Sequence, residues 1–456
     1  MEKFFISLTN ISFFLILYIV YLFNYDILTI TFIILYVVFQ LIIILLHYNY
    51  IYVRNALNLF DGLLVVLFGV FLHSTIAALI TYYNNILIHE RFWAHKDVPE
   101  AFLLLYLSFL SIQIGYYSLS FRQRVVIFKD KTLSEFRLII FLFIIVIYIL
   151  FFLFEGLSNN TNFHISGTIN YIFFPIIFAI PYFLILLKSD KKAFDYFIIF
   201  MGLFITVYIS LYFRIGSKAG LVNIGIAYLV YRNYFIEKIS FIRAGIFFSL
   251  AVIVMFYINY FRSIGYFSNI SFADLNPFIN PDTATIFWQS SIGSLSTPFE
   301  ALLVTINHFP DVTPFQYGIR VMEDFIYPLW PRDFWPDKPS VYGAATMWQD
   351  VASHFNVYED RMYESISLPG HFYQDFGWVG TILSGLLLGM SANYIYFNLA
   401  FKNYNKASIA LYSFTLINLL LASRAFPWTT ITVLTYVILP ALLINLLLKK
   451  KRDEIS

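Results

Sequence analysis

Apolar segments long enough to cross a lipid bilayer follow one another along most of this chain. A spanning helix needs about 20 predominantly apolar residues, and only 12% of the residues here are charged, about half the share of soluble domains. Twelve segments qualify: 4–23, 27–46, 58–81, 101–121, 137–154, 168–187, 193–213, 216–231, 241–260, 374–399, 407–422 and 428–448. The sequence therefore predicts an all-α polytopic membrane protein with about twelve transmembrane helices.

Lysine and arginine are distributed unevenly between the two ends of these segments. The basic tail 449–452 marks a cytoplasmic end, because cytoplasmic loops carry an excess of Lys and Arg. Counting back from this tail places 19 of the 29 basic residues on the same side. We therefore expect both termini to be cytoplasmic. The remaining ten fall outside: Arg91, Lys96, Arg214, Lys218, Arg262, Arg320, Arg332, Lys338, Arg361 and Arg424.

Residues 261–370 interrupt the apolar pattern and are expected to face outward. They contain 10 of the 15 prolines and 4 of the 7 tryptophans, with 12 acidic and 5 basic residues. Three parts follow: a membrane bundle at 1–260, a large outer loop with short helices at 261–370, and further membrane helices with the basic tail at 371–456. Loops on a rigid scaffold carry binding and catalytic residues, so this loop favours an enzyme.

Local patterns predict two short helices in this loop. Thr297 is placed as an N-cap, with Pro298 at the first helical position and Glu300 closing a capping box. Residues 344–356 form the second predicted helix. Between them, residues 330–340 contain too many prolines for a helix or a central strand.

Composition excludes several classes of chemistry. The chain has no cysteine, so disulfides, thiolate metal sites and cysteine nucleophiles are ruled out. No Asp-x-Asp motif and no histidine pair with zinc-ligand spacing occurs, so we expect neither a metal nor a cofactor. The net charge of +2 is not concentrated in a basic face, and we expect no nucleic-acid partner.

The outward cations are the first candidate site residues. Arg214 and Lys218 occupy the short turn between two segments, where small residues allow close approach to the backbone. Arg262 directly follows the segment 241–260, and Arg424 lies in the last outer turn. Together with Lys338 they suit a phosphate or diphosphate. Anchoring to lipid headgroups is the alternative explanation for each of them.

Four residues are candidates for a general base: Glu300, Glu323, Asp324 and His371. The capping box is the alternative role for Glu300, and an interfacial hydrogen bond is the alternative for His371. His47 and His73 are expected to be satisfied histidines of the helix bundle or surface residues.

Several of these patterns resemble Wzy-type bacterial polysaccharide repeat-unit polymerases, which serve O-antigen, capsule and enterobacterial common antigen assembly. The similar elements are the large outer loop and four short motifs within roughly residues 200–430: 216–218, 296–300, 335–340 and 372–380. Lys218 and Lys338 stand where that pattern has arginine, which removes bidentate geometry.

The resemblance implies a metal-independent glycosyltransferase in the bacterial cytoplasmic (inner) membrane. It would transfer a glycan from undecaprenyl diphosphate to a hydroxyl of a second lipid-linked repeat unit. A chain-length regulator and a flippase are the implied protein partners. Three sets of site residues follow: Glu300, His371, Arg262 and Lys218 in catalysis; Arg214, Lys218, Arg262 and Arg424 on diphosphates; Arg320, Glu323, Asp324 and Lys338 on the glycan.

Two other functions remain open. A lipid-linked oligosaccharide flippase or permease also fits twelve helices, although it does not require a large outer loop. An outer-face glycan ligase uses a similar donor and differs by moving the glycan to another acceptor. Whether the product is polymeric separates the ligase from the polymerase.

Overall fold

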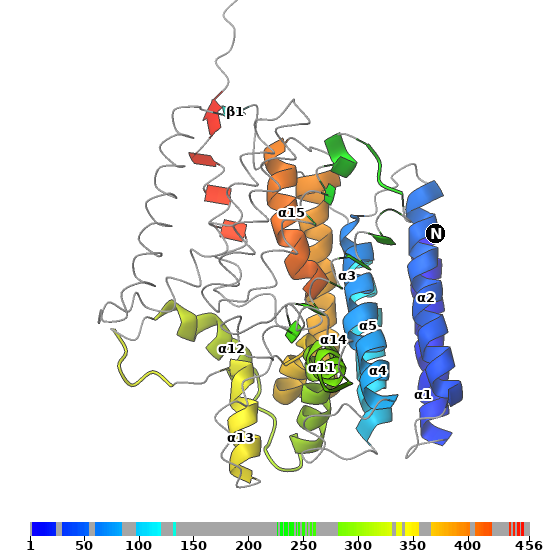
Figure 1. Ribbon diagram of the computed structural model, residues 1–456, viewed down its shortest axis with the longest axis vertical. Coiled ribbons are helices and arrows are strands. Elements are labelled where there is room, and N and C mark those ends of the chain that lie inside the picture. Colours follow the sequence, from blue (N-terminus) through cyan, green and yellow to red (C-terminus); the bar gives the residue numbers. More distant parts are fainter. Residues whose placement is uncertain are drawn as a thin grey trace, which may run out of the picture. The chain divides into compact units, whose positions relative to one another are not determined.

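The computed structural model describes residues 2–23, 30–53, 60–83, 97–119, 131–133, 281–330, 334–339, 343–354, 366–401, 406–421 and 448–450, with single residues between 226 and 260 and between 437 and 446. The chain forms two compact units. Unit 1 consists of residues 1–122, 277–396 and 418–430, and unit 2 consists of residues 123–276, 397–417 and 431–456. Within the described ranges the structure is helical apart from one short ribbon (Figure 1).

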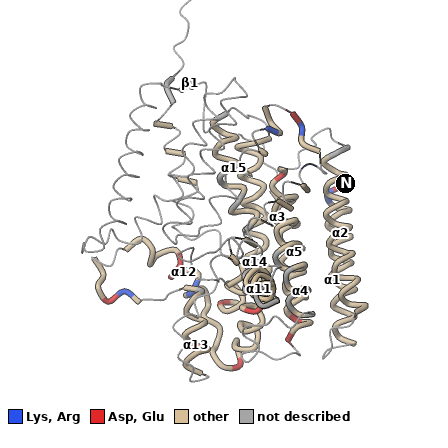
Figure 2. Tube along the Cα trace, viewed as in Figure 1, with Lys and Arg blue, Asp and Glu red and all other residues tan. Residues whose placement is uncertain are grey.

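Five helices among the described residues are long and apolar enough to cross a membrane. They are α1 (Glu2–Phe23), α2 (Ile30–Val53), α3 (Gly62–Val70) continued through the π-turn η1 (Phe71–Ile76) into α4 (Ala77–Tyr83), α5 (Val98–Ser118), and α14 (Leu368–Tyr396) with η7 (Phe397–Phe401). Charged residues are sparse along these spans (Figure 2).

The predicted segments 4–23, 27–46, 58–81, 101–121 and 374–399 are confirmed by these spans, with their ends shifted by a few residues. The segment 407–422 corresponds to the shorter apolar helix α15 (Lys406–Leu421). The segments 137–154, 168–187 and 193–213 lie outside the described residues. Of 216–231, 241–260 and 428–448 the structure describes only scattered positions.

Helix α5 is the centre of unit 1, and almost all of its side chains are buried. It packs closely on α14 because glycines face the contact. A Cβ at Gly385 would lie 2.6 Å from the Ser111 Cβ, and one at Gly389 would overlap the carbonyl of Ile112. Real Cβ atoms are not found at such distances, so larger residues would force the two helices apart.

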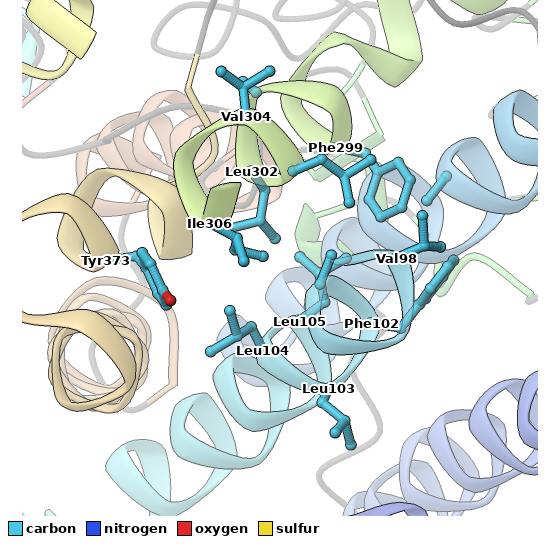
Figure 3. Packing of buried hydrophobic residues seen from close by; sticks show 14 of the residues in the cluster. Val98, Phe102, Leu103, Leu104, Leu105, Phe299, Leu302, Val304, Ile306 and Tyr373 are labelled. Atoms are coloured by element: carbon cyan, nitrogen blue, oxygen red, sulfur yellow. The ribbon is translucent and has the colours of Figure 1, made fainter. Parts of the chain in front are cut away.

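Residues 261–370 contain a long helix, α11 (Pro281–His308), whose second half is buried. The sequence predicted a helix beginning only after Thr297. The capping-box assignment is therefore wrong, since Pro298 lies inside α11. An internal proline removes one helical hydrogen bond, and burial of residues 299–306 against α5 compensates for this loss. Figure 3 shows Phe299, Leu302 and Ile306 of α11 facing the apolar residues of α5.

Shorter elements complete this region. They are α12 (Ile319–Ile326), η5 (Tyr327–Leu329), η6 (Gly343–Ala345) and α13 (Thr346–His354). Helix α13 confirms the helix predicted at 344–356. The described residues between 330 and 339 contain no helix or strand, as the prolines there predicted. Helices α12 and α13, yellow-green and yellow, lie in the lower part of Figure 1.

A histidine cluster closes one end of α5, and we call it the His47 cluster: His47, Asp61, Tyr116 and Tyr117. The His47 Nε2 atom lies 2.9 Å from Asp61 Oδ1, and its Nδ1 atom lies 2.6 Å from the Tyr117 hydroxyl. The Asp61 carboxylate also accepts hydrogen bonds from the Tyr116 hydroxyl at 2.8 Å and from two backbone N–H groups at the start of α3. Asp61 is thus the N-cap of α3, and His47 is a satisfied bundle histidine, as predicted.

Unit 2 contains a two-stranded antiparallel ribbon. Strand β1 (Lys131–Leu133) pairs with β2 (Leu448–Lys450), with Lys131 opposite Lys450. The predicted helix 428–448 therefore ends before Leu448. The two strands come from a loop and a tail that the distribution of Lys and Arg predicts to lie on one side of the membrane.

Candidate functional site

The Val98 end of α5 is the point where several polar side chains from distant parts of the chain meet. Trp378 Nε1 of α14 donates to Glu100 Oε1 in the first turn of α5, at 3.0 Å. Asn307 Nδ2, near the end of α11, donates to Asp97 Oδ2 at 2.9 Å. These bonds bring the start of α5, the end of α11 and the first part of α14 together.

Helix α14 begins with a capped and sharply bent segment. The Ser367 hydroxyl accepts from the Gly370 N–H at 3.2 Å, so Ser367 acts as the N-cap. The helix breaks at Gly377, where φ is +59°, a conformation that glycine adopts without steric cost. A Cβ at that position would lie 2.9 Å from the Phe315 ring. Residues 368–376 therefore form a separate short helix that leads into the span.

This short helix holds α12 in place through Asp375. The backbone N–H groups of Gln316 and Tyr317 donate to the carbonyls of Gln374 and Asp375 at 3.1 and 3.0 Å. The buried Asp375 carboxylate then accepts from the N–H groups of Arg320 and Val321, in the first turn of α12, at 3.3 and 3.0 Å. A carboxylate at a helix N-terminus satisfies free N–H groups and opposes the helix dipole. Asp375 thus caps α12 from another helix.

Arg320 lies between two carboxylates. Its guanidinium is 3.1 Å from Asp350 of α13 and 3.5 Å from Glu323 of α12. Glu323 also accepts from the Gly343 N–H at 2.8 Å. Burial raises the pKa of the Asp350 carboxyl, and the Arg320 charge opposes that shift. These two carboxylates therefore balance most of the positive charge of the Arg320 guanidinium. A charge-balanced guanidinium suits recognition of sugar hydroxyls better than capture of a diphosphate.

His371 and Asp324 form a second histidine–carboxylate pair. The His371 Nε2 atom lies 3.1 Å from Asp324 Oδ2, and the side chains are 1% and 14% exposed. A Cβ at Gly343 would overlap the Asp324 carboxylate, so this carboxylate needs a glycine at that position. Arg320, Glu323, Asp324, Asp350 and His371 are named the His371 cluster below.

Glu300 and Lys338 are the other predicted site residues that the structure describes. Glu300 is fully buried on α11, among apolar residues that pack on α5. The Lys338 ammonium donates to the Trp330 carbonyl at 3.1 Å. Arg214, Lys218, Arg262 and Arg424 lie outside the described residues, as does the side chain of His73.

Sequence reasoning missed three polar residues of this region: Asp350, Asp375 and Gln374. The Gln374 side chain is fully buried, and neither its amide oxygen nor its amide nitrogen has a hydrogen-bond partner among the described residues. Leaving a buried amide unpaired costs about 1–3 kcal/mol, so such a group calls for an explanation, such as a catalytic role or a bound water or ion. Only the polar Gln374-Asp375 pair inside an apolar segment signalled these positions in the sequence.

No group of three or more His, Cys, Asp or Glu residues with metal-binding geometry occurs in the portion of the chain that the structure describes. The described side chains of the region provide a proton acceptor, a charged pair and an amide group. These groups suit acid–base chemistry on a hydroxyl-rich molecule.

The described residues form a largely helical membrane protein with a buried polar cluster where the spans α5 and α14 begin. Comparison with known proteins gives two curated relatives, each called O-antigen polymerase, from Salmonella typhimurium and Salmonella typhi. Each is 29% identical over 193 residues, which cover 40% of this chain and 40% of the relative. The resemblance to Wzy-type polymerases expected from the sequence is thereby confirmed as a distant similarity. No family model matches the chain, and no solved structure matches it either.

Proposed function

We propose that this protein is a glycosyltransferase that polymerises undecaprenyl-diphosphate-linked oligosaccharide repeat units into a bacterial surface polysaccharide. The similarity to two proteins named O-antigen polymerase carries this proposal. The five spans and the buried acid–base cluster at their ends support it. The product is an O-antigen, capsule or common-antigen polysaccharide.

The proposed topology has twelve spans, with both termini in the cytoplasm and residues 261–370 outside the bacterial inner membrane. The β1–β2 ribbon supports it, because its strands come from a loop and a tail both assigned to the cytoplasm. Length also agrees, since the 21 residues of α5 reach about 30 Å, the thickness of the hydrocarbon core. The His371 cluster then lies at the outer face and the His47 cluster at the inner face.

The reaction proposed is a single transfer. The bond between the donor's anomeric carbon and the phosphate oxygen breaks, and undecaprenyl diphosphate leaves with the electron pair. An acceptor hydroxyl oxygen bonds to that carbon, and its proton passes to a protein base. We assign Arg214, Lys218, Arg262 and Arg424 to the diphosphates, where positive charge stabilises the leaving group. Lys218 and Arg262 are also assigned to catalysis.

The base is assigned to the His371–Asp324 pair, with Glu300 as the second candidate. An imidazole that accepts a proton next to a carboxylate forms an imidazolium that the carboxylate stabilises. Arg320, Glu323 and Lys338 are assigned to the glycan. The buried amide of Gln374 offers two donors and one acceptor, a set that sugar hydroxyls satisfy.

Substrates and partners follow from the same reaction. The donor and acceptor are both lipid-linked oligosaccharides within the membrane, and a flippase and a chain-length regulator act beside the polymerase. Neither a metal nor a cofactor is part of the proposed step.

A flippase or permease and an outer-face ligase are the alternatives. In cells lacking the gene, single repeat units on the outer surface support a polymerase, whereas accumulation on the cytoplasmic side would indicate transport. A product of one unit on a different acceptor would indicate a ligase.

Substitution of the proposed diphosphate cations tests the assignment. Arg262→Ala and Lys218→Ala should each abolish the ladder of long chains in a gel of surface glycan, at normal protein level. Arg91→Ala serves as the matched control, because Arg91 is also assigned to the outer side but to no step. A full ladder from either cation variant would refute the role of that residue.

A further inference from the structure

Helix α12 and the turn η5 that follows it expose a row of apolar side chains. Its members are Ile319, Met322 and Ile326 of α12, Leu329 of η5, and Trp330 directly after η5, which we call the α12 strip. The three members on α12 recur at the spacing of one helix face, and all five are 42% to 56% exposed. A row of this kind in a soluble surface marks an interaction site.

The strip cannot turn inward, because the polar side of α12 is held by the protein. Asp375 caps the first turn of the helix. Arg320 pairs with Asp350, and Glu323 accepts from the Gly343 N–H. With one side fixed by these bonds, the apolar side must face whatever surrounds the protein.

The hydrogen bonds of α12 place it where a span ends. Gln316 and Tyr317 bond to Gln374 and Asp375, directly before the break of α14 at Gly377. One residue later, Trp378 bonds to Glu100 in the first turn of the span α5. The start of α12 is therefore tied to the level at which two spans begin.

Past the break, α14 itself exposes large apolar side chains. Val379, Leu383 and Leu387 are 61%, 42% and 47% exposed on a helix long enough to cross a membrane, so lipid is their natural surrounding. The α12 strip adds further exposed apolar side chains near the end of this span. Trp330 in the strip and Tyr317 beside it are of the kinds enriched at membrane–water interfaces.

We propose that the α12 strip lies in the lipid boundary of the membrane face at which α5 begins, with α12 as an interfacial amphipathic helix. Such helices bury their apolar side about 5–10 Å into the region between headgroups and acyl chains. Arg320, Glu323 and Asp324 of the His371 cluster belong to the same helix. The lipid surface therefore fixes the depth of this cluster relative to the membrane.

Site-directed spin labelling tests this placement directly, because the natural chain has no cysteine. Met322→Cys and Ile326→Cys label the strip. Leu383→Cys provides the reference for a lipid-facing position, and the exposed Gln349→Cys on α13 provides the reference for an aqueous one. Each full-length protein is placed in vesicles of phosphatidylethanolamine and phosphatidylglycerol. Collision with oxygen, which concentrates in lipid, is compared with collision with a water-soluble nickel chelate.

We expect the oxygen-to-nickel ratio at positions 322 and 326 to be several-fold higher than at position 349, and below the ratio at position 383. Ratios at both strip positions equal to that at 349 would place the strip in water and overturn the proposal. Low collision with both reagents would indicate a protein partner or a second copy, and would overturn it as well. Labelled proteins are compared only where their melting temperature matches that of the unlabelled chain.

Discussion

The two ends of α5 each carry a buried histidine beside a carboxylate, and their surroundings differ. In the His47 cluster, both ring nitrogens and the Asp61 carboxylate have partners, and the two side chains are 1% and 5% exposed. In the His371 cluster the histidine is equally buried, but Asp324 is 14% exposed and Arg320, Glu323 and Asp350 are 13%, 16% and 29% exposed.

This difference distinguishes a structural pair from the pair that we propose as the base. The His47 cluster joins α2, α3 and α5 and leaves no atom of Asp61 for a substrate, so its value is stability. The His371 cluster sits on short helices that a glycine break separates from the span, and its carboxylates remain partly open. The Asp324, Glu323 and Asp350 carboxylates are therefore accessible in a way that Asp61 is not.

The largest effect is expected on stability, from a substitution in the His47 cluster. Asp61→Ala removes the cap of α3 and leaves His47 and the Tyr116 hydroxyl without their shared acceptor. We expect a loss of about 3–5 kcal/mol, because a helix cap contributes about 1 kcal/mol and each buried group left without its hydrogen-bond partner costs about 1–3 kcal/mol. Unfolding in detergent measures it, with Asp337→Ala, an exposed aspartate, as the control. Lost polymer at unchanged stability would instead assign chemistry to this end.

The second effect is on activity, at the His371 cluster. Asp324→Asn keeps the shape of the side chain and removes the charge that stabilises an imidazolium. Polymer formation should fall about 100-fold or more, the usual range for an acid–base group, with stability changed by less than about 1 kcal/mol. Asp337→Asn in the same loop should leave polymer length unaltered. A normal ladder from Asp324→Asn would show that the His371 cluster, like the His47 cluster, has no role in the reaction.

Substitution of Gln374 should have a smaller effect, which lowers activity without lowering stability. Gln374→Leu removes a buried amide that lacks a partner, so stability should stay level or rise by about 1 kcal/mol. Loss of a glycan hydrogen bond should lower polymer formation about tenfold. A variant that is less stable and fully active would show that the amide has a structural partner.

The smallest effect concerns pH at the end of α11. Burial lowers the pKa of His308 to about 4, and the neighbouring His354 adds to the shift. Since the folded-state pKa lies below the unfolded value of about 6.5, the unfolded chain binds the proton first as pH falls. Stability is therefore complete above about pH 6.5 and declines toward pH 4.

The melting temperature of the natural chain should drop by about 2–4 °C more between pH 7 and pH 5 than that of His308→Gln. Equal slopes for the two proteins would mean that His308 is accessible to protons in the folded state.

The sequence predicted the elements that depend on local composition better than those that depend on contacts between distant residues. Spans such as α1 and α5 were predictable, because their apolar composition alone requires a membrane or a core. The start of α11 was not, because a local capping pattern at Thr297 competed with tertiary packing that no local signal contains.

The site was predicted in its residue types more than in its arrangement. His371 and Asp324 were named separately, but 47 positions separate them and nothing local indicates their pairing. Arg320 was expected to contact glycan, and its neutralisation by Asp350 depends on how α13 docks. Asp375 was overlooked as a cap because it acts on a helix 55 residues earlier.

The most direct test of the account is polymerisation by the purified protein in lipid vesicles. Undecaprenyl-diphosphate-linked repeat units, extracted from cells lacking the gene, serve as the only substrate. The account predicts a ladder of lengthening glycans and one undecaprenyl diphosphate released for each new linkage. Single units that stay unlinked in the presence of folded protein, with no diphosphate released, would contradict it.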